Sequence, residues 1–242
     1  MSFDRLLYDH GRWHYELIEA LGCYRQLCSF CSDDTALSAH LTADGRPHRL
    51  SEQGQIIGVE DKEFDCWKAS IAASIDTAIS AYRRQLIVVI VSVTETAIAE
   101  AFEVLFAFKP ETMKGLEKDV QDQRLSLVTS LDELMAAVQL DSLRLSIVDR
   151  AVTFVTQGRN KQTVLRKIAK LFGEPVKATV SESYLALVKL RNEIVHDNAK
   201  CDISDQEIEQ SFETGVSVVE ELGWLVAKHG LPMHDPMHVF HD

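Results

Sequence analysis

The amino-acid sequence predicts an all-α protein, an up-and-down bundle of helices with a helical arm at its N-terminal end. Three observations lead to this prediction. Only 5 prolines and 11 glycines interrupt the 242 residues, and these two residue types disfavour helix most strongly. The long stretches between them are rich in Ala, Leu, Glu, Lys and Gln, which favour helix. No convincing alternation of apolar and polar residues, the pattern of a half-buried strand, runs through them.

Residues 1–60 are expected to form the arm and an irregular connection. Apolar positions such as Leu6, Leu21 and Leu27 predict a first helix over residues 3–31. Residues 32–61 differ, because SDD, ADGRP and EQGQ place turn-forming residues around a short apolar IIGV. A long connection with little regular structure is unusual inside a compact domain, so this segment is interpreted as a boundary or a mobile element.

Residues 61–230 are expected to form the bundle itself. The helical pattern runs almost unbroken from Glu63 to Phe108, as one helix or as two joined near Arg83-Arg84, until Lys109-Pro110 ends it. Amphipathic segments follow at 111–140 and 141–157, and further helices are predicted at 163–172, at the stretch described next, and at 204–228. The tail, residues 231–242, is predicted to be extended.

The most informative stretch is the hexapeptide RNEIVH at residues 191–196. It belongs to a predicted helix that is capped at Ser181 or Ser183 and has a stop signal at Asp197-Asn198. The apolar stripe of this helix comprises Tyr184, Leu187, Leu190, Ile194 and Val195. Arg191 projects into that stripe, whereas Asn192 and His196 lie one turn apart at its polar edge. Because an unpaired buried charge is costly, Arg191 must meet a carboxylate, a phosphate or a partner chain.

This hexapeptide resembles the signature of the HEPN superfamily, in which an arginine is followed directly by a polar residue and then, after a short spacing, by a histidine. Arg191, Asn192 and His196 match it. The resemblance covers roughly residues 85–230 as an order of helices, and the hexapeptide is its specific part. It implies a helical bundle that forms a homodimer, with two motifs facing each other across a two-fold axis as a composite RNA-cleaving site. It also implies a toxin, abortive-infection or other defence setting, where an antitoxin or regulatory partner can act.

The residue types suit cleavage of RNA without a metal or a cofactor. A histidine can accept the proton of the attacking ribose 2′-hydroxyl, because its unperturbed pKa lies near neutrality. An arginine can grip two phosphate oxygens and remains charged at any working pH. These roles fall to His196 and Arg191, and Asn192 can orient the imidazole or bind a ribose hydroxyl. The zinc interpretation of Cys28-x2-Cys31 is weaker, since no second pair of ligands follows at a suitable spacing.

Glu95 is a candidate supporting residue. It shares a helix face with Val88, Val91 and Phe102, where a carboxylate is as misplaced as Arg191 is in its own stripe. Two misplaced opposite charges on two core helices predict an ion pair between Glu95 and Arg191. Such a pair would hold the arginine in its working rotamer.

Formal net charge is −12, which is unfavourable for a protein that binds a polyanion. The charge is unevenly spread, however, because six cations and one acid lie between residues 159 and 177. The candidate RNA-binding residues there are Arg159, Lys161, Arg166, Lys167 and Lys170. Ordinary charge scatter on a solvated helix face remains the alternative interpretation of this segment.

The expected compartment is the cytoplasm. The N-terminal residues lack the apolar core of a signal peptide, and an odd number of cysteines, 5, indicates reduced thiols. The longest apolar run, residues 86–108, is interrupted by Glu95, Glu100 and Glu103, which favours a buried bundle helix over a membrane span. Three functions remain open: a homodimeric endoribonuclease, a catalytically inactive binding or assembly module of the same fold, and a purely structural helical bundle.

Overall fold

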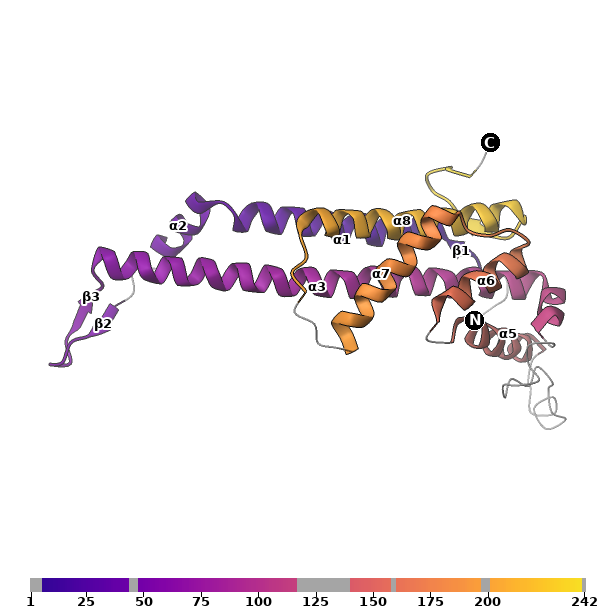
Figure 1. The fold of residues 1–242 in the computed structure, drawn as a ribbon, viewed down its shortest axis with the longest axis horizontal. Coiled ribbons are helices and arrows are strands. Elements are labelled where there is room, and N and C mark those ends of the chain that lie inside the picture. Colours follow the sequence, from indigo (N-terminus) through magenta and orange to yellow (C-terminus); the bar gives the residue numbers. More distant parts are fainter. Residues whose placement is uncertain (1–5, 44–47, 117–139, 158–159, 197–200, 241–242) are drawn as a thin grey trace.

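The computed structural model describes residues 6–43, 48–116, 140–157, 160–196 and 201–240. These residues are mostly helical, which confirms the all-α prediction. Figure 1 shows an elongated molecule, with a bundle of helices at one end and a narrow helical arm at the other. Two short strand pairs accompany the helices, and the sequence pattern predicted neither of them.

The arm consists of the C-terminal part of α1 (His10–Cys31), helix α2 (Asp34–Ala43), the N-terminal part of α3 (Asp61–Phe108), and a hairpin at the tip. The hairpin pairs β2 (His48–Leu50) with β3 (Ile56–Gly58) in antiparallel register. The predicted irregular connection over residues 32–61 therefore contains regular structure. Its turn-forming residues close a helix and a hairpin instead of forming one long loop.

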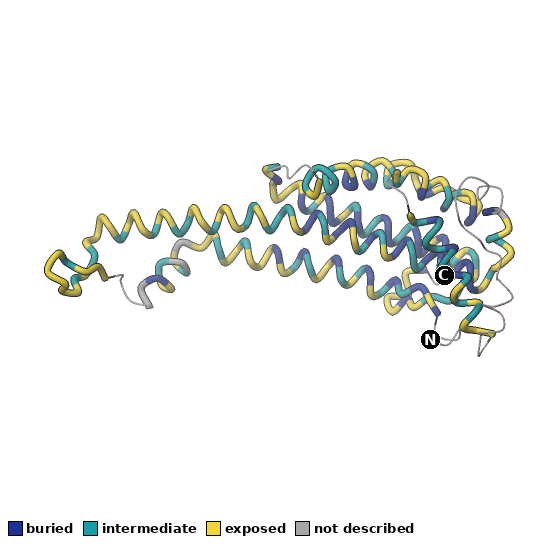
Figure 2. The backbone as a smooth tube through the Cα atoms, turned by 90° about the horizontal axis from the view of Figure 1, so that it is seen from below, coloured by how far each residue is buried: buried dark blue, intermediate teal, exposed yellow. Residues whose placement is uncertain are grey.

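Helix α3 is one unbroken helix of 48 residues, which decides between the two arrangements that the sequence left open. At 1.5 Å per residue it is about 72 Å long. Its start is stabilised by a capping box between Glu60 and Glu63. The buried positions begin only at Leu86, so the first half of α3 lies in the arm and the second half runs through the core, as the burial colours in Figure 2 show.

The core forms where the second half of α3 meets the first half of α1, whose Trp13, Leu17 and Leu21 are buried, and four further helices. These are α5 (Leu140–Thr156), α6 (Lys161–Phe172), α7 (Ala178–His196) and α8 (Asp205–Lys228), with the 3₁₀ helix η2 (Pro110–Leu116) after α3. Helix α8 packs along both α3 and α1, and α7 packs on α3 and α8. Large side chains with no solvent exposure fill the space between these helices, among them Phe102, Phe106 and Tyr184.

The junction of α1, α3 and α8 depends on a glycine. A Cβ atom added at Gly215 would lie 2.8 Å from Cγ2 of Ile90 and 3.3 Å from Cδ1 of Leu17. The first distance is shorter than carbon atoms tolerate, so the absence of a side chain allows the three helices to approach each other this closely.

The C-terminal tail is folded back onto the bundle. Strand β4 (Met233–His234) pairs in parallel with β1 (Tyr8–Asp9), and His234 Nδ1 lies 2.9 Å from Asp9 Oδ1. Further along, Phe240 is buried against the backbone of Gly223, where an added Cβ would lie 2.5 Å from the ring. The residues after β4, as far as Phe240, turn back to cover the end of α1 and α8, whereas the sequence pattern predicts an extended tail.

A histidine and a carboxylate are enclosed beneath this tail. His10 has no solvent exposure, and its Nδ1 lies 3.7 Å from Oδ1 of Asp235. The ring of Phe240 packs edge-on against the imidazole with centroids 4.7 Å apart. Burial lowers the pKa of His10, and the charges of Asp235 and Asp9 offset this only in part.

His10 is therefore expected to make the folded protein less stable as the pH falls from about 7 to about 5. Unfolded His10, with a pKa near 6.5, binds a proton more readily than folded His10 does. The stability that neutral His10 contributes to the fold is thus fully present above the pKa of the unfolded state and is lost on acidification. Urea unfolding of wild-type protein and His10→Gln at both pH values tests this. The variant should show the weaker pH dependence, and equal dependence would contradict the assignment. Glu100, whose pKa burial raises, acts in the opposite direction, but equally in both proteins.

Candidate functional site

Helix α7 carries the hexapeptide, and its buried face sets the orientation of the site. Tyr184, Leu187 and Val188 are buried and anchor the first part of the helix. The helix begins at Ala178, before the predicted caps Ser181 and Ser183, and its last residue is His196. The predicted stop signal, Asp197-Asn198, lies outside the described residues. The three motif residues occupy the final turns of α7, beyond the buried anchors.

Arg191 is half-buried and is held by its neighbour in sequence. Its Nη1 donates a hydrogen bond to Oδ1 of Asn192 at 3.0 Å. Its Nε is buried without a hydrogen-bond partner, and no ion pair of Arg191 occurs within the described parts of the chain. Among the residues that the structure describes, the guanidinium is therefore positioned by an amide and is not neutralised by a carboxylate, which leaves its positive charge able to act on an anion.

His196 is exposed at the C-terminal end of α7. Asn192 and His196 are separated by about one turn and share a face, whereas Arg191 and His196 are offset by about 140° around the axis and about 7.5 Å along it. The neighbouring Val195 is 46% exposed although it belongs to the apolar stripe. One helix therefore presents one arginine and one histidine in different directions, beside an apolar side chain with no cover.

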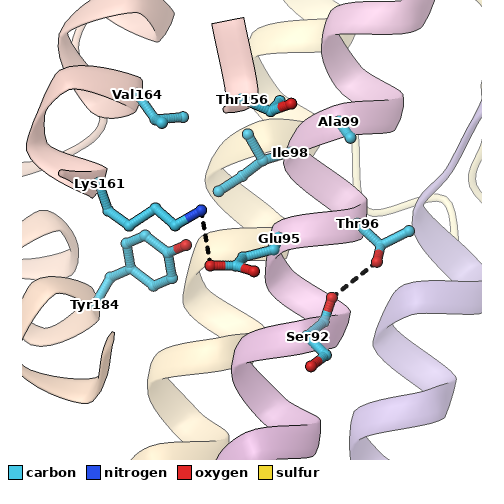
Figure 3. Close-up of a pocket in the computed structure, with 9 residues that line it drawn as sticks. All are labelled: Ser92, Glu95, Thr96, Ile98, Ala99, Thr156, Lys161, Val164 and Tyr184. Carbon is cyan, nitrogen blue, oxygen red and sulfur yellow. Dashed lines mark hydrogen bonds and ion pairs between the residues drawn. The ribbon is translucent and has the colours of Figure 1, made fainter. Parts of the chain in front are cut away.

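The predicted pair between Glu95 and Arg191 is wrong. Oε1 of Glu95 lies 2.8 Å from Nζ of Lys161 at the start of α6 (Figure 3). The helical pattern correctly indicated that Glu95 is partly withdrawn from solvent and needs a cation. The pattern does not identify the cation, because the partner of Glu95 depends on how α6 and α7 are placed over α3.

The basic segment keeps only part of its charge on the surface. Lys161 is used in the pair with Glu95. Lys167 donates to the carbonyl oxygen of Phe154 at 2.9 Å and lies over the Phe154 ring at 4.4 Å, which satisfies the carboxyl end of α5. Arg166 and Lys170 are exposed one turn apart on α6. The fifth candidate, Arg159, lies outside the described residues.

A cavity of about 300 Å³, which the sequence pattern does not predict, surrounds the Glu95–Lys161 pair. Tyr184 lines it as well, and burial together with the charge of Glu95 raises the pKa of its phenol above the usual range. The helical pattern of the sequence indicates only that Tyr184 belongs to an apolar stripe. Its hydroxyl was the one available signal that this position also faces polar surroundings.

A second polar junction that the sequence did not predict joins the arm to the bundle. Arg83 Nε donates to the hydroxyl of Tyr24 at 2.7 Å, and Arg83 Nη2 lies 2.5 Å from Oδ1 of Asp205. The Tyr24 hydroxyl also donates to Asp205. These contacts tie α1, α3 and the start of α8 together, so this junction has a structural role.

Within the described part of the chain, no helix is both long and apolar enough to cross a membrane. Among the same residues, no group of three or more histidine, cysteine or acidic side chains is arranged to hold a metal ion. Comparison with family models, with curated proteins and with solved structures finds no match to this chain.

Proposed function

We propose that this protein is a metal-independent endoribonuclease of HEPN type, whose active site forms between two copies of the chain. The observation that supports it is the state of Arg191, a half-buried guanidinium held by Asn192 and not neutralised by any carboxylate among the described residues. It lies within the same final turns of α7 as the exposed His196. The resemblance of the hexapeptide adds a defence-associated setting, with an antitoxin or other regulatory partner.

The chemistry follows from these side chains. His196 accepts the proton of the ribose 2′-hydroxyl as that oxygen attacks the neighbouring phosphorus. Arg191 stabilises the additional negative charge on the phosphorane oxygens through its fork of N–H donors. A second histidine returns a proton to the departing 5′-oxygen. The products are a 2′,3′-cyclic phosphate and a free 5′-hydroxyl, and no bond change requires a metal ion or a cofactor.

The second copy supplies what one helix lacks. A single α7 offers one histidine for two proton transfers, and its arginine is offset from that histidine around the helix axis. A two-fold arrangement of the ends of α7 would bring together two arginines and two histidines. It would also cover Val195, whose exposure in one copy is unusual for a member of an apolar stripe.

Cleavage is therefore expected to require a dimer. Purified protein incubated with total RNA in EDTA should yield fragments that end in 2′,3′-cyclic phosphate, and activity per chain should fall as dilution separates the copies. Light scattering on the same samples gives the mass. Undiminished activity of a monomer would contradict the composite site, and cleavage that is lost on chelation and restored by magnesium would contradict the mechanism.

A binding or assembly module without catalysis is the second candidate. The net charge of −12 favours it, together with the use of Lys161 and Lys167 in contacts inside the protein. This candidate predicts a dimer that leaves RNA intact under the same conditions, so the cleavage assay separates the two functions.

A further inference from the structure

The hairpin at the tip of the arm exposes its apolar side chains. Leu50 of β2 and Ile56 of β3 lie opposite each other on the two strands and are 71% and 73% exposed. Figure 2 shows this tip in the colours of exposed and intermediate residues. An isolated two-stranded hairpin is only marginally stable in water, and a further strand would stabilise it. The hairpin therefore has the composition of a structure that is completed by a partner.

The outer edge of β3 presents hydrogen-bonding groups of the backbone. The amide of Ser51 donates to the carbonyl oxygen of Gln55 at 2.8 Å, which closes the loop of the hairpin. Residues along an antiparallel pair then alternate between hydrogen-bonded and non-bonded positions. Counted from this bond, the N–H and C=O groups of Ile56 and Gly58 point away from β2. Within the described chain no third strand pairs with them.

Space is available beside this edge. A Cβ atom added at Gly58 would meet no other side chain or backbone atom within 4 Å in the described part of the chain. The segment from Gln55 to Val59 carries no charge, although a charge is the usual protection of an exposed strand edge. Strand β2 differs, because it carries Arg49, whose Nη1 lies 2.6 Å from Oε1 of Glu63. Of the two strands, β3 is therefore better suited to accept a neighbour.

The charge around the hairpin distinguishes between possible partners. Residues 48–65 contain five acids and two cations, and one of these cations, Arg49, is paired with Glu63. This surplus of negative charge disfavours an anionic membrane surface and a nucleic acid. It also disfavours a second copy of the chain, which would bring the same acids to the contact. A basic segment of another protein is the complementary partner.

We propose that the outer edge of β3 binds an extended, basic segment of a partner protein as a third strand. The segment exchanges backbone hydrogen bonds with Ile56 and Gly58 and places an apolar side chain beside Ile56. Its basic side chains lie near Glu52 in the hairpin loop or near the acids at the start of α3. Backbone bonds supply affinity in this mode of recognition, and side chains at alternate positions supply selectivity.

This contact is independent of the proposed nuclease activity. Helix α3 starts at Asp61 and its buried positions begin at Leu86, which is 86 − 61 = 25 residues later. At 1.5 Å per residue the arm therefore carries the hairpin about 38 Å from the start of the core. Figure 1 shows the hairpin at one end of the molecule, away from α7. A strand bound there does not contact His196, so His196→Ala should bind it as the wild type does.

Short synthetic peptides added to the full chain test the partner's chemistry. One panel alternates valine, isoleucine or phenylalanine with threonine and carries lysine at both ends, and a matched panel carries glutamate there. Fluorescence polarisation should show about tenfold or more tighter binding of the lysine panel, and added salt should weaken it. Equal binding of the two panels would overturn the proposal, as would the failure of every lysine peptide to bind.

Hydrogen exchange of backbone amides, followed by NMR, locates the bound strand. With a lysine peptide bound, the amides of Ile56 and Gly58 should exchange about tenfold or more slowly, because they become hydrogen-bonded. The amides of His48 and Leu50, which point outward on the other edge, should keep their exchange rates. Protection confined to His48 and Leu50, or protection of neither edge, contradicts the assignment to β3.

Two proline variants separate the edges. Gly58→Pro removes one outward N–H of β3, a change that an edge strand tolerates, and should weaken binding of the lysine peptides by about fivefold or more. His48→Pro is the matched control on the outer edge of β2 and should bind normally. Slow exchange of the Ile57 amide in both variants verifies that the hairpin persists. Ile56→Thr keeps a β-branched side chain with less apolar surface, so it should also bind more weakly. Wild-type affinity in Gly58→Pro and Ile56→Thr, or an equal loss in His48→Pro, argues against the proposed edge.

The other occupants have their own signatures. Sedimentation over a range of concentrations would reveal self-association that Gly58→Pro abolishes, which would assign the edge to a second copy. Binding to vesicles of phosphatidylserine and phosphatidylcholine that Ile56→Thr weakens would assign the tip to a membrane surface. Either result would overturn the assignment to a basic protein segment.

Discussion

Replacement of Arg191 by alanine is expected to lower RNA cleavage by about a hundredfold or more while the fold is retained, because a donor aimed at the developing phosphorane charge contributes on this scale. Lys189→Ala is the matched control, since Lys189 is a strongly exposed cation on the same helix. Arg191→Lys preserves the charge but not the fork of donors, so it should restore only a small part of the activity.

The matching change at His196 should have a similar effect, since proton transfer typically contributes about 10² to 10⁴ in rate. Because His196 is exposed at the end of α7, its replacement should not unfold the protein. A loss of activity would therefore reflect the loss of the imidazole. Initial rates are measured with a labelled oligonucleotide, and circular dichroism checks the fold. If both variants cleave RNA as fast as Lys189→Ala does, the hexapeptide is not the active site.

Phe102→Ala should destabilise the fold by about 3–5 kcal/mol, the range for removing a buried aromatic ring. Phe102 has no solvent exposure, and its ring centroid lies 5.8 Å from that of Phe106 and 6.1 Å from that of Phe172. The substitution therefore leaves a cavity between α3 and α6 that its neighbours fill only in part.

Phe108→Ala is the control for this change, because Phe108 is the last residue of the same helix and is 42% exposed. It should destabilise the protein by less than half as much. The free energies of unfolding come from urea titrations. If the two variants lose the same free energy of unfolding, the side chains around Phe102 do not form a tightly packed core.

The sequence was sufficient to predict most helices because their ends carry local signals. Lys109 and Pro110 end α3 as predicted, Gly173 closes α6 in the left-handed conformation, and Ser204 caps α8 through a capping box. Each signal acts over a few residues, so it can be recognised without knowledge of the tertiary structure. The motif residues likewise lie on one helix, as their spacing predicts.

The errors concern contacts between distant segments. Glu95 pairs with Lys161, 66 positions away in the numbering of the chain, and the pattern of one helix cannot specify its neighbour's register. The tail is docked because Phe240 packs against Gly223 of α8 and because strand β4 pairs with β1 at the other end of the sequence. The cavity around Tyr184 exists only after α6 and α7 have been packed on α3, so no local signal could have predicted its shape.

The unbroken course of α3 also sets a rotational relation between the two ends of the molecule. Each residue turns an α-helix by about 100° and advances it by about 1.5 Å. One residue inserted near Arg83, where the arm meets the bundle, would therefore swing the hairpin β2–β3 through that angle around the helix axis. An insertion of about seven residues, close to two full turns, would extend the arm and nearly preserve the direction in which it faces. Changes in the length of this helix are thus best tolerated in steps of whole turns.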